Sequence, residues 1–231
     1  MKIEGNLVQG VFKKRLNRFL AVVNIDGSEN SCFLPNPGRM HELLVPGTEM
    51  ILKEINDVKR KTHYDILGVF YKGMIVSIDS RIPNKLIFEA LKNDEIEEFS
   101  GYTRIKPEFA YGSSRFDFLL TNGKPCIIEA KSCTLVNNGV ALFPDAVTER
   151  GSRHLLELIK AKKEGYRACV LFLVQRIDAK YFSPNDETDT KFGKTLREAS
   201  KNGVEIYAYT SELKGNEIKI KKRIPVKIMI Y

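Results

Sequence analysis

The chain has 231 residues, of which 43% are hydrophobic, so it can form one large or two small domains with a substantial core. Its 37 lysines and arginines exceed its 29 aspartates and glutamates, and the net charge of +8 with a pI near 9.2 favours a polyanionic partner. No apolar run approaches the length of a membrane span and residues 1–5 do not open a signal peptide, so we expect a soluble, cytoplasmic protein.

The cysteines are scattered along the chain and form no Cys-x-x-Cys pair: Cys32, Cys126, Cys133 and Cys169. This pattern predicts free thiols in a reducing compartment rather than disulfides. With only three histidines to add, a zinc site is not expected.

Residues 1–82 are mostly β-prone. Short apolar runs predict strands at residues 6–12, 19–25, 31–34, 49–55, 65–71 and 74–79, with Asp26-Gly27 as a hairpin turn. The Pro35-Asn36-Pro37-Gly38 loop interrupts them, and residues 39–44 are expected to form one helical turn. This many strands in about eighty residues predicts a small barrel of the OB type. Such a barrel either grips nucleic acid or serves as a packing platform, and both interpretations stay open here.

The character of the chain changes near Arg81, and residues 83–231 predict a second, mixed α/β domain. Asn84 is expected to cap a helix over residues 85–99, followed by strands at 102–111, 115–120 and 125–131. A helix over 152–163, a buried strand at 168–175, a helix at 191–202, a strand at 204–209 and one or two strands in 217–231 follow, with a solvated loop at 183–190. The order helix, three strands, helix, strand is the αβββαβ core of restriction-endonuclease-like folds.

The predicted hairpin of residues 115–131 carries the chemistry. Side chains alternate along a strand, so Glu129 and Lys131 share a face, and a turn centred near Gly123 sets Asp117 across from Glu129. Two carboxylates on adjacent strands can hold Mg²⁺, which can activate water and neutralise charge on a phosphodiester. A lysine two residues on can steady that water or the phosphate. Asp, then Glu-x-Lys, resembles the core of the PD-(D/E)xK nuclease motif.

Ordinary explanations compete with this one. A solvent-exposed acid–base pair accounts for most Glu-x-Lys sequences, although the apolar flanks here favour a buried strand whose carboxylates need a partner or a metal. In the restriction-endonuclease-like fold a glutamate on the first helix often joins the metal site. Glu89 is the candidate, against an ordinary surface glutamate, and Glu108 is a weaker rival.

Several longer segments resemble the sugar fermentation stimulation protein family along essentially the whole chain. They are Val11-Phe12 with Arg15, Asn17-Arg18-Phe19, Pro35-Asn36-Pro37-Gly38-Arg39-Met40, Glu129-Ala130-Lys131-Ser132-Cys133-Thr134-Leu135 and Phe143-Pro144-Asp145-Ala146-Val147-Thr148-Glu149-Arg150-Gly151. The resemblance implies an OB-like barrel joined to a nuclease-like domain, with DNA binding as the described property. It matches the family's catalytic-type positions to Asp117, Glu129 and Lys131. One departure is Pro37, where threonine is expected, which puts the polar contacts of that loop in doubt.

Candidate DNA contacts come from these segments and from three basic clusters: Lys13-Lys14-Arg15 with Arg18, Lys59-Arg60-Lys61, and Lys219-Lys221-Lys222-Arg223. Arg150, Arg153 and His154 near the start of a helix could hold a phosphate, or form an ordinary solvated first turn, while Asp145 could cap that helix. The full set of candidate DNA-binding residues is Lys13, Arg15, Arg18, Arg39, Arg115, Thr134, Arg150, Arg153 and His154.

The sequence therefore predicts a DNA-binding protein with a Mg²⁺- or Mn²⁺-dependent phosphodiesterase site formed by Asp117, Glu129 and Lys131, with Glu89 as a further metal ligand. The alternative is a non-catalytic DNA-binding regulator of sugar metabolism genes that keeps the nuclease scaffold. An RNA-binding barrel with a structural second domain is less favoured because it leaves the acidic cluster unexplained. No helix-turn-helix is apparent, so we expect salt-sensitive binding to the DNA backbone, and a homodimer stays open.

Overall fold

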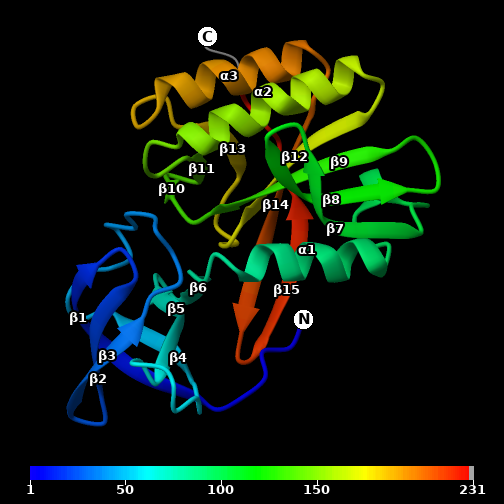
Figure 1. The fold of residues 1–231 in the computed structure, drawn as a ribbon. Helices are drawn as coiled ribbons and strands as arrows, with labels where there is room; N and C mark the ends of the chain where they lie inside the picture. Colours follow the sequence, from blue (N-terminus) through cyan, green and yellow to red (C-terminus); the bar gives the residue numbers. More distant parts are fainter. Residues whose placement is uncertain (229–231) are drawn as a thin grey trace.

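Five strands close into a barrel in the computed structural model, which describes residues 1–228 (Figure 1). They are β1 (Leu7–Asn17), β2 (Leu20–Ile25), β3 (Ser28–Phe33), β4 (Glu49–Glu54) and β5 (Tyr64–Tyr71). β1 pairs with β2 and β4, β2 pairs with β3, and the pairings of β5 with β3 and β4 complete the ring. Alternating residues such as Phe12, Met50, Leu52 and Ile66 fill the interior. The predicted OB-type barrel is confirmed.

The sheet of the barrel continues into the sheet of the second domain. β6 (Met74–Ser77) pairs with β5 and also with β14 (Glu205–Lys214), through Ile75 and Leu213. The first residues of the chain, which the sequence assigned to the barrel, instead lie on the second domain. The backbone of Lys2 forms an isolated antiparallel β-bridge with Glu217 on β15 (Glu217–Arg223), and Ile3 packs into the second domain's core.

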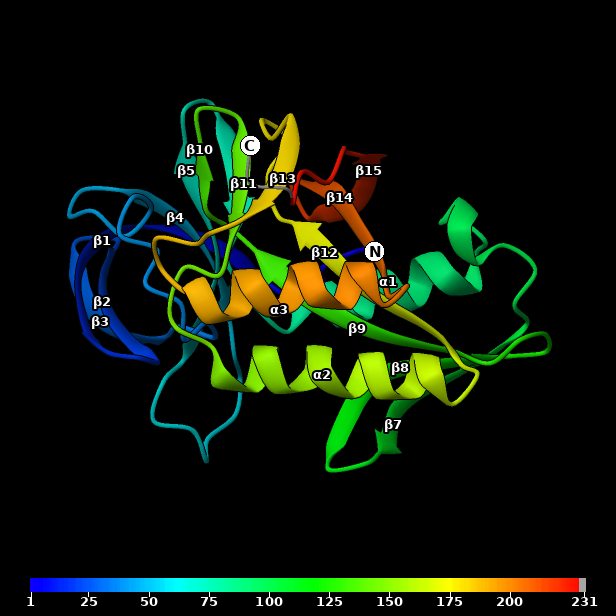
Figure 2. The same ribbon diagram turned by 90° about the horizontal axis from the view of Figure 1, so that it is seen from above.

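The second domain is a mixed sheet with helices on both faces. Its strands β7 (Arg104–Tyr111), β8 (Ser114–Thr121), β9 (Cys126–Cys133), β12 (Arg167–Val174) and β14 lie side by side. β9 runs antiparallel to β8 and parallel to β12. α1 (Ile82–Lys92) covers one face, while α2 (Glu149–Lys163) and α3 (Thr190–Lys201) lie together on the other (Figures 1 and 2).

The alternation along β12 shows why this strand is apolar throughout. Val170 and Phe172 point into the core under α2 and α3, whereas Cys169 and Leu171 point into the core under α1. A strand that is buried on both faces needs apolar side chains at every position. The predicted order of helix, three strands, helix and strand is therefore present, as α1, β7, β8, β9, α2 and β12. All four cysteines are buried and free.

Besides shifts in element bounds, such as α2 beginning at Glu149 and β14 continuing to Lys214, the structure differs from the predicted elements in three places. The first helix begins at Ile82 and ends at Lys92, because Asp94 adopts a left-handed conformation and only a short turn, η1 (Glu97–Phe99), follows. A small sheet of β10 (Val136–Asn137), β11 (Val140–Phe143) and β13 (Tyr181–Pro184) was not predicted. Residues 183–190 are not simply a solvated loop, since buried Asp189 caps α3 by accepting from the Phe192 amide and also accepts from the Thr148 amide.

The strand or strands predicted in residues 217–231 correspond to β15, and residues 229–231 lie outside the described residues. Across residues 1–228, no helix has the length and apolar character needed to span a bilayer.

Candidate functional site

The β8–β9 hairpin brings the two predicted carboxylates together. Phe118 lies opposite Ile128, and the next step of the same register sets Asp117 opposite Glu129. Both residues line a cleft of about 430 Å³ between the two domains, together with Lys131 on β9. The barrel contributes the other wall through Arg18 and residues 36–38. The antiparallel register thus places the acidic pair and the lysine in one open site.

Asp117 is fixed from two sides. The Asn84 side-chain amide donates to its Oδ1 (2.5 Å), and the Ala130 backbone N–H donates to its Oδ2 (2.7 Å). Burial raises the pKa of Asp117 above its ordinary value, and the negative charge of Glu129 raises it further. The ionised form of Asp117 is therefore disfavoured, and a bound cation would stabilise it.

Glu129 is almost fully buried, at 3% exposure, and only one of its oxygens is occupied. Oε1 accepts from the Lys131 ammonium and lies 2.6 Å from His154 Nδ1. Burial alone would raise the pKa of Glu129, but Lys131 and His154 together hold it below its ordinary value. Oε2 is buried and has no hydrogen-bond partner among the described residues. A buried carboxylate oxygen without a donor has an unmet need for positive charge.

His154 lies behind this site rather than at its surface, which corrects the prediction that it contacts DNA. It is 1% exposed, and its ring packs 5.4 Å from the Phe116 ring. Arg150 Nε donates toward His154 Nε2 at 3.4 Å, which leaves Nδ1 as the ring nitrogen that contacts Glu129 Oε1. The second turn of α2 points inward at this position. His154 therefore orients Glu129 and is not available to a phosphate.

Glu89 does not join the site, and the prediction of a helix-borne metal ligand at that position is wrong. Its side chain is half exposed and pairs with the N-terminal amine of Met1 at 3.3 Å. Asn84 on α1 faces the hairpin, where it contacts Asp117, and Glu89 lies about 140° further round the same helix. Glu108, the weaker rival, is exposed on β7 and pairs with Arg115 at 3.4 Å.

The residues present fit a hard divalent cation. Among residues 1–228 there is no group of three or more histidine, cysteine, aspartate or glutamate side chains able to hold a metal. Mg²⁺ differs from zinc in this respect, because it commonly uses one or two protein carboxylates and completes its shell with water and substrate phosphate. Asp117 with the free Oε2 of Glu129 is such a donor set.

Basic residues from both domains lie at the cleft. Arg18 from the β1–β2 turn and Arg150 from α2 line it with the carboxylates. A second hollow of about 310 Å³ shares Arg18 with the first and adds Arg39 and His41 from the barrel. Arg18 therefore lies on both hollows, which together form a cationic path toward Asp117.

Arg15 has a structural role, contrary to its expected DNA contact. Its five N–H donors go to the backbone carbonyl oxygens of Asn17, Arg18, Asn36, Gly38 and Arg39, at 2.5–3.1 Å. No donor is left for a phosphate. Arg15 instead ties the β1–β2 turn to the loop that walls the cleft.

The remaining candidate DNA contacts divide by location. Lys13, Arg115 and Arg153 are exposed but line neither hollow. Thr134 lines the cleft but is buried, and its carbonyl accepts from Arg176. These four therefore contribute less to the site than Arg18, Arg39 and Arg150.

The loop of residues 35–38 needs no side-chain donor at Pro37. Asn36 Nδ2 donates to the Ile78 carbonyl, and Asn36 Oδ1 accepts from the Gly38 amide. Asp145 does not cap α2, which is capped by Thr148, but reaches across to the barrel and accepts from the Met40 amide at 3.4 Å. A side chain at position 38 would meet Asp145 Oδ2 at 2.6 Å, so glycine is required there.

Two polar contacts at the site were missed by the sequence interpretation. Asn84 was taken for a helix cap because it precedes an apolar stripe, yet it binds Asp117. Gln175 at the end of β12 donates to Ser132 Oγ at 2.8 Å beside the Glu-x-Lys run. Neither carries a local sequence signal, since each partner is more than thirty residues away.

Comparisons with known proteins cover nearly the whole length of the chain. A family model described as the sugar fermentation stimulation protein RE domain matches residues 81–217, and one described as the SfsA N-terminal OB domain matches residues 14–78. Two relatives named sugar fermentation stimulation protein homolog are similar: one from Caldanaerobacter subterraneus subsp. tengcongensis (50% identity, 98% of this chain and 99% of the relative) and one from Clostridium kluyveri (46%, 99% and 100%).

A solved structure is also similar over nearly the whole chain. It is described as Pyrococcus furiosus SfsA in complex with Ca²⁺, with 31% identity, a TM-score of 0.90, and coverage of 98% of this chain and 99% of that one.

Proposed function

Because the chain belongs to the sugar fermentation stimulation protein family, with OB and RE domains in that order, we propose that it is a DNA-binding protein with a divalent-metal-dependent phosphodiesterase site. One observation carries the proposal. Asp117 and Glu129 converge in an open cleft beside Lys131, and a buried oxygen of Glu129 has no partner among the described residues. Family membership by itself does not specify this chemistry.

Asp117 and Glu129 would hold the cation, which we propose to be Mg²⁺ or Mn²⁺. The Ca²⁺ bound in the solved Pyrococcus furiosus relative supports a hard divalent ion at a site of this kind. Such an ion, when bound, supplies an activated water and neutralises charge on a phosphodiester. The protein's part is to keep the two carboxylates in place, through Asn84 and Ala130 for Asp117 and through His154 for Glu129.

We propose that Lys131 is the catalytic lysine of this site. Its ammonium contacts Glu129 Oε1 and lies at the edge of the cleft, with the side chain mostly buried. From there it can donate to a phosphate oxygen or to the attacking water, where charge develops. Arg18 and Arg150 then hold the neighbouring phosphates, which agrees with the chain's net charge of +8.

A non-catalytic DNA-binding regulator is the second candidate. It is favoured by the contact between Lys131 and Glu129, in which the lysine and the carboxylate already neutralise each other. A site balanced in this way can bind a DNA backbone without turnover. The distinction between the two functions is thus whether the bound strand is cut.

The test compares wild type, Glu129→Gln and a matched control, Glu89→Gln, on plasmid and single-stranded DNA. The control removes an exposed carboxylate of the same type from the same domain. Each protein is incubated with Mg²⁺, Mn²⁺, Ca²⁺ or a chelator, and binding is measured separately by fluorescence anisotropy. We expect metal-dependent cleavage in wild type and Glu89→Gln and its loss in Glu129→Gln. Intact binding without cleavage of any DNA form would instead favour the regulator, and no binding at all would reject both.

A further inference from the structure

Phe19 packs on one neighbouring ring, Phe33, and lines neither hollow of the proposed site. It is 46% exposed, and it is the one aromatic ring among the large hydrophobic side chains exposed within residues 1–228. It follows Arg18, which lines both hollows, at the turn between β1 and β2. Exposed aliphatic side chains are common on protein surfaces, but an exposed phenyl ring one residue after the cleft-lining Arg18 offers a flat face to a ligand.

The backbone at Phe19 is held rigidly. Its N–H donates to Asn17 Oδ1 at 2.9 Å, and its carbonyl accepts from the Leu34 amide at 2.9 Å. Arg15 adds a bond to the neighbouring Arg18 carbonyl at 2.8 Å. The ring is therefore presented from a fixed turn, so little conformational freedom would be lost when a ligand binds it.

A second aromatic ring, that of Phe33, lies next to Phe19. Phe19 stacks on Phe33, with centroids 6.4 Å apart and planes inclined by 26°. The guanidinium groups of Arg60 and Arg81 each lie 5.5 Å from the centroid of Phe33. Such cation–aromatic contacts are favourable and hold the Phe33 ring in place.

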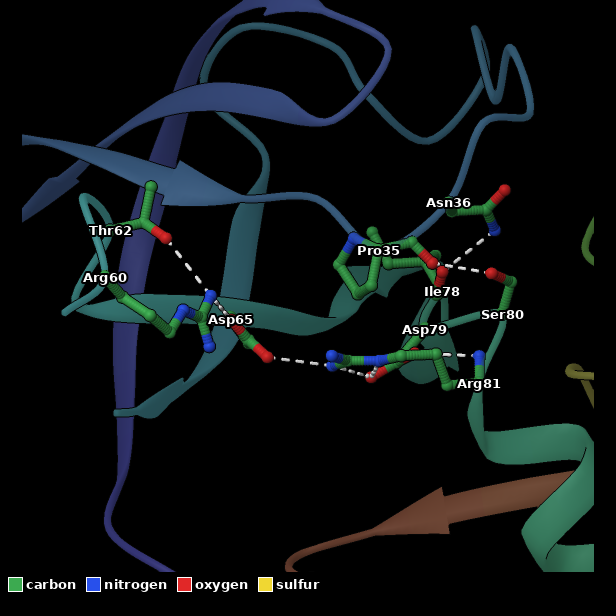
Figure 3. Close-up of polar contacts among 9 residues, drawn as sticks. All are labelled: Pro35, Asn36, Arg60, Thr62, Asp65, Ile78, Asp79, Ser80 and Arg81. Atoms are coloured by element: carbon green, nitrogen blue, oxygen red, sulfur yellow. Dashed lines mark hydrogen bonds and ion pairs between the residues drawn. The ribbon is translucent and has the colours of Figure 1, made fainter. Parts of the chain in front are cut away.

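Two buried carboxylates hold these arginines, as Figure 3 shows. Asp65 accepts from Arg60 (2.6 Å) and Arg81 (2.8 Å), and Asp79 accepts from Arg81 at 2.6–3.1 Å. Both aspartates are only 3% exposed. Burying two carboxylates is costly unless they are paired, and here the pairing fixes the guanidinium groups beside Phe33. The network neutralises these two arginines, whereas Arg18, which precedes Phe19, forms no ion pair within residues 1–228.

We propose that Phe19 is a stacking platform for an unpaired base, and that the DNA engaged by this protein is single-stranded where it enters the cleft. This inference rests on the proposed function and names its substrate class. A strand with free base faces matches both features, because a base can lie on the ring while its phosphates meet Arg18 on the way to Asp117. In a duplex the base faces are covered by their neighbours, so the ring would have nothing to stack on.

The first experiment measures binding of wild type, Phe19→Ala and Phe19→Tyr to a fluorescent single-stranded oligonucleotide and to a hairpin duplex of the same length, in chelator. Leu16→Ala is the matched control, because Leu16 is an exposed aliphatic side chain on the same hairpin. Base–aromatic stacking predicts that Phe19→Ala weakens single-strand binding by about 5-fold to 150-fold. Phe19→Tyr, Leu16→Ala and all duplex affinities should change by less than about twofold, and the salt dependence should be unaltered because no charge is removed.

A second experiment isolates the base. An oligonucleotide with abasic residues should bind wild type and Phe19→Ala equally. The chain contains nine tyrosines but no tryptophan, so Phe19→Trp adds a single tryptophan that can be excited selectively. A stacked base should quench its fluorescence and an abasic strand should not. Thermal unfolding of each variant checks that the fold is kept.

Equal losses on single strand and duplex, or an unchanged single-strand affinity in Phe19→Ala, would overturn the inference, as would equal quenching by the abasic strand. These results are separable from the cleavage test. If wild type binds and cuts DNA and Phe19→Ala behaves like wild type, only the platform is wrong. If wild type binds no DNA, the proposed function fails as well.

Discussion

Replacing Arg81 by alanine should lower the free energy of unfolding markedly, even though the residue lies at the surface between the two domains. Arg81 makes all of the side-chain hydrogen bonds that Asp79 receives among the described residues, through Nε at 2.9 and 3.1 Å and Nη2 at 2.6 Å. Asp65 would keep its bond from Arg60. The variant therefore leaves one buried carboxylate with little more than the backbone amide at position 81.

The size of the effect follows from burial. Removing one partner of a buried ion pair costs about 3–5 kcal/mol, because the other charge is left uncompensated. The Arg81 side chain is 48% exposed, so water can partly replace it and we take about 2–3 kcal/mol. For a chain of this length about 1 kcal/mol corresponds to about 2–4 °C, which gives a fall in Tm of about 4–12 °C.

Urea unfolding and thermal scans of wild type, Arg81→Ala and Arg81→Ala with Asp79→Asn provide the measurement. The double variant should recover most of the loss, because the orphaned charge is gone. A loss below about 1 kcal/mol in the single variant, or no recovery in the double one, would refute the reasoning that a buried unpaired carboxylate is the cause.

Three further predictions concern the site. Asn84→Ala should lower the affinity for Mn²⁺ about tenfold or more by calorimetry, since it removes a donor that orients Asp117, whereas unchanged affinity would deny Asn84 that role. In chelator, Asp117→Asn should gain stability relative to wild type as the pH rises above about 4. The folded pKa of Asp117 lies above its ordinary value, so ionisation of this carboxyl in wild type opposes folding. A difference in Tm that does not change with pH would contradict this. Arg18→Ala should reduce the slope of log affinity for DNA against log salt by about one, while Arg15→Ala should lower the Tm and leave the slope unchanged; the opposite pattern would show that the two roles are reversed.

Most of the fold could be predicted because its signals are local. The alternation of apolar residues and the turn residues around Gly27 and Gly123 mark the strands, and the continuous apolar run at 168–174 marks the central buried strand. Asp117 and Glu129 followed from the same reasoning, since a hairpin register depends only on its turn. The start of α1 was misplaced by three residues, because Asn84 was taken for the cap although Pro83 fits the first turn of a helix. Asn84 therefore lies inside the helix, where it contacts Asp117.

What could not be predicted depends on contacts between distant segments. His154 was read as a basic residue in a helix's first turns, but its position behind Glu129 is set by the packing of α2 on the sheet. The donors of Arg15 are taken by two loops that meet only when the barrel closes. In both cases the residue type was compatible with DNA binding, and only the tertiary structure shows that its polar groups are already engaged.

The pairing of β6 with β14 has a practical consequence for dividing the protein. Ile75 and Leu213 face each other there, and a side chain at Gly68 would meet Leu213 at 3.3 Å. Expressing residues 81–228 alone would strip that flank of β14 and leave unpaired backbone N–H and C=O groups next to apolar Leu213. An open, apolar strand edge recruits other chains, so we expect the isolated second domain to aggregate, because the barrel no longer covers this part of β14.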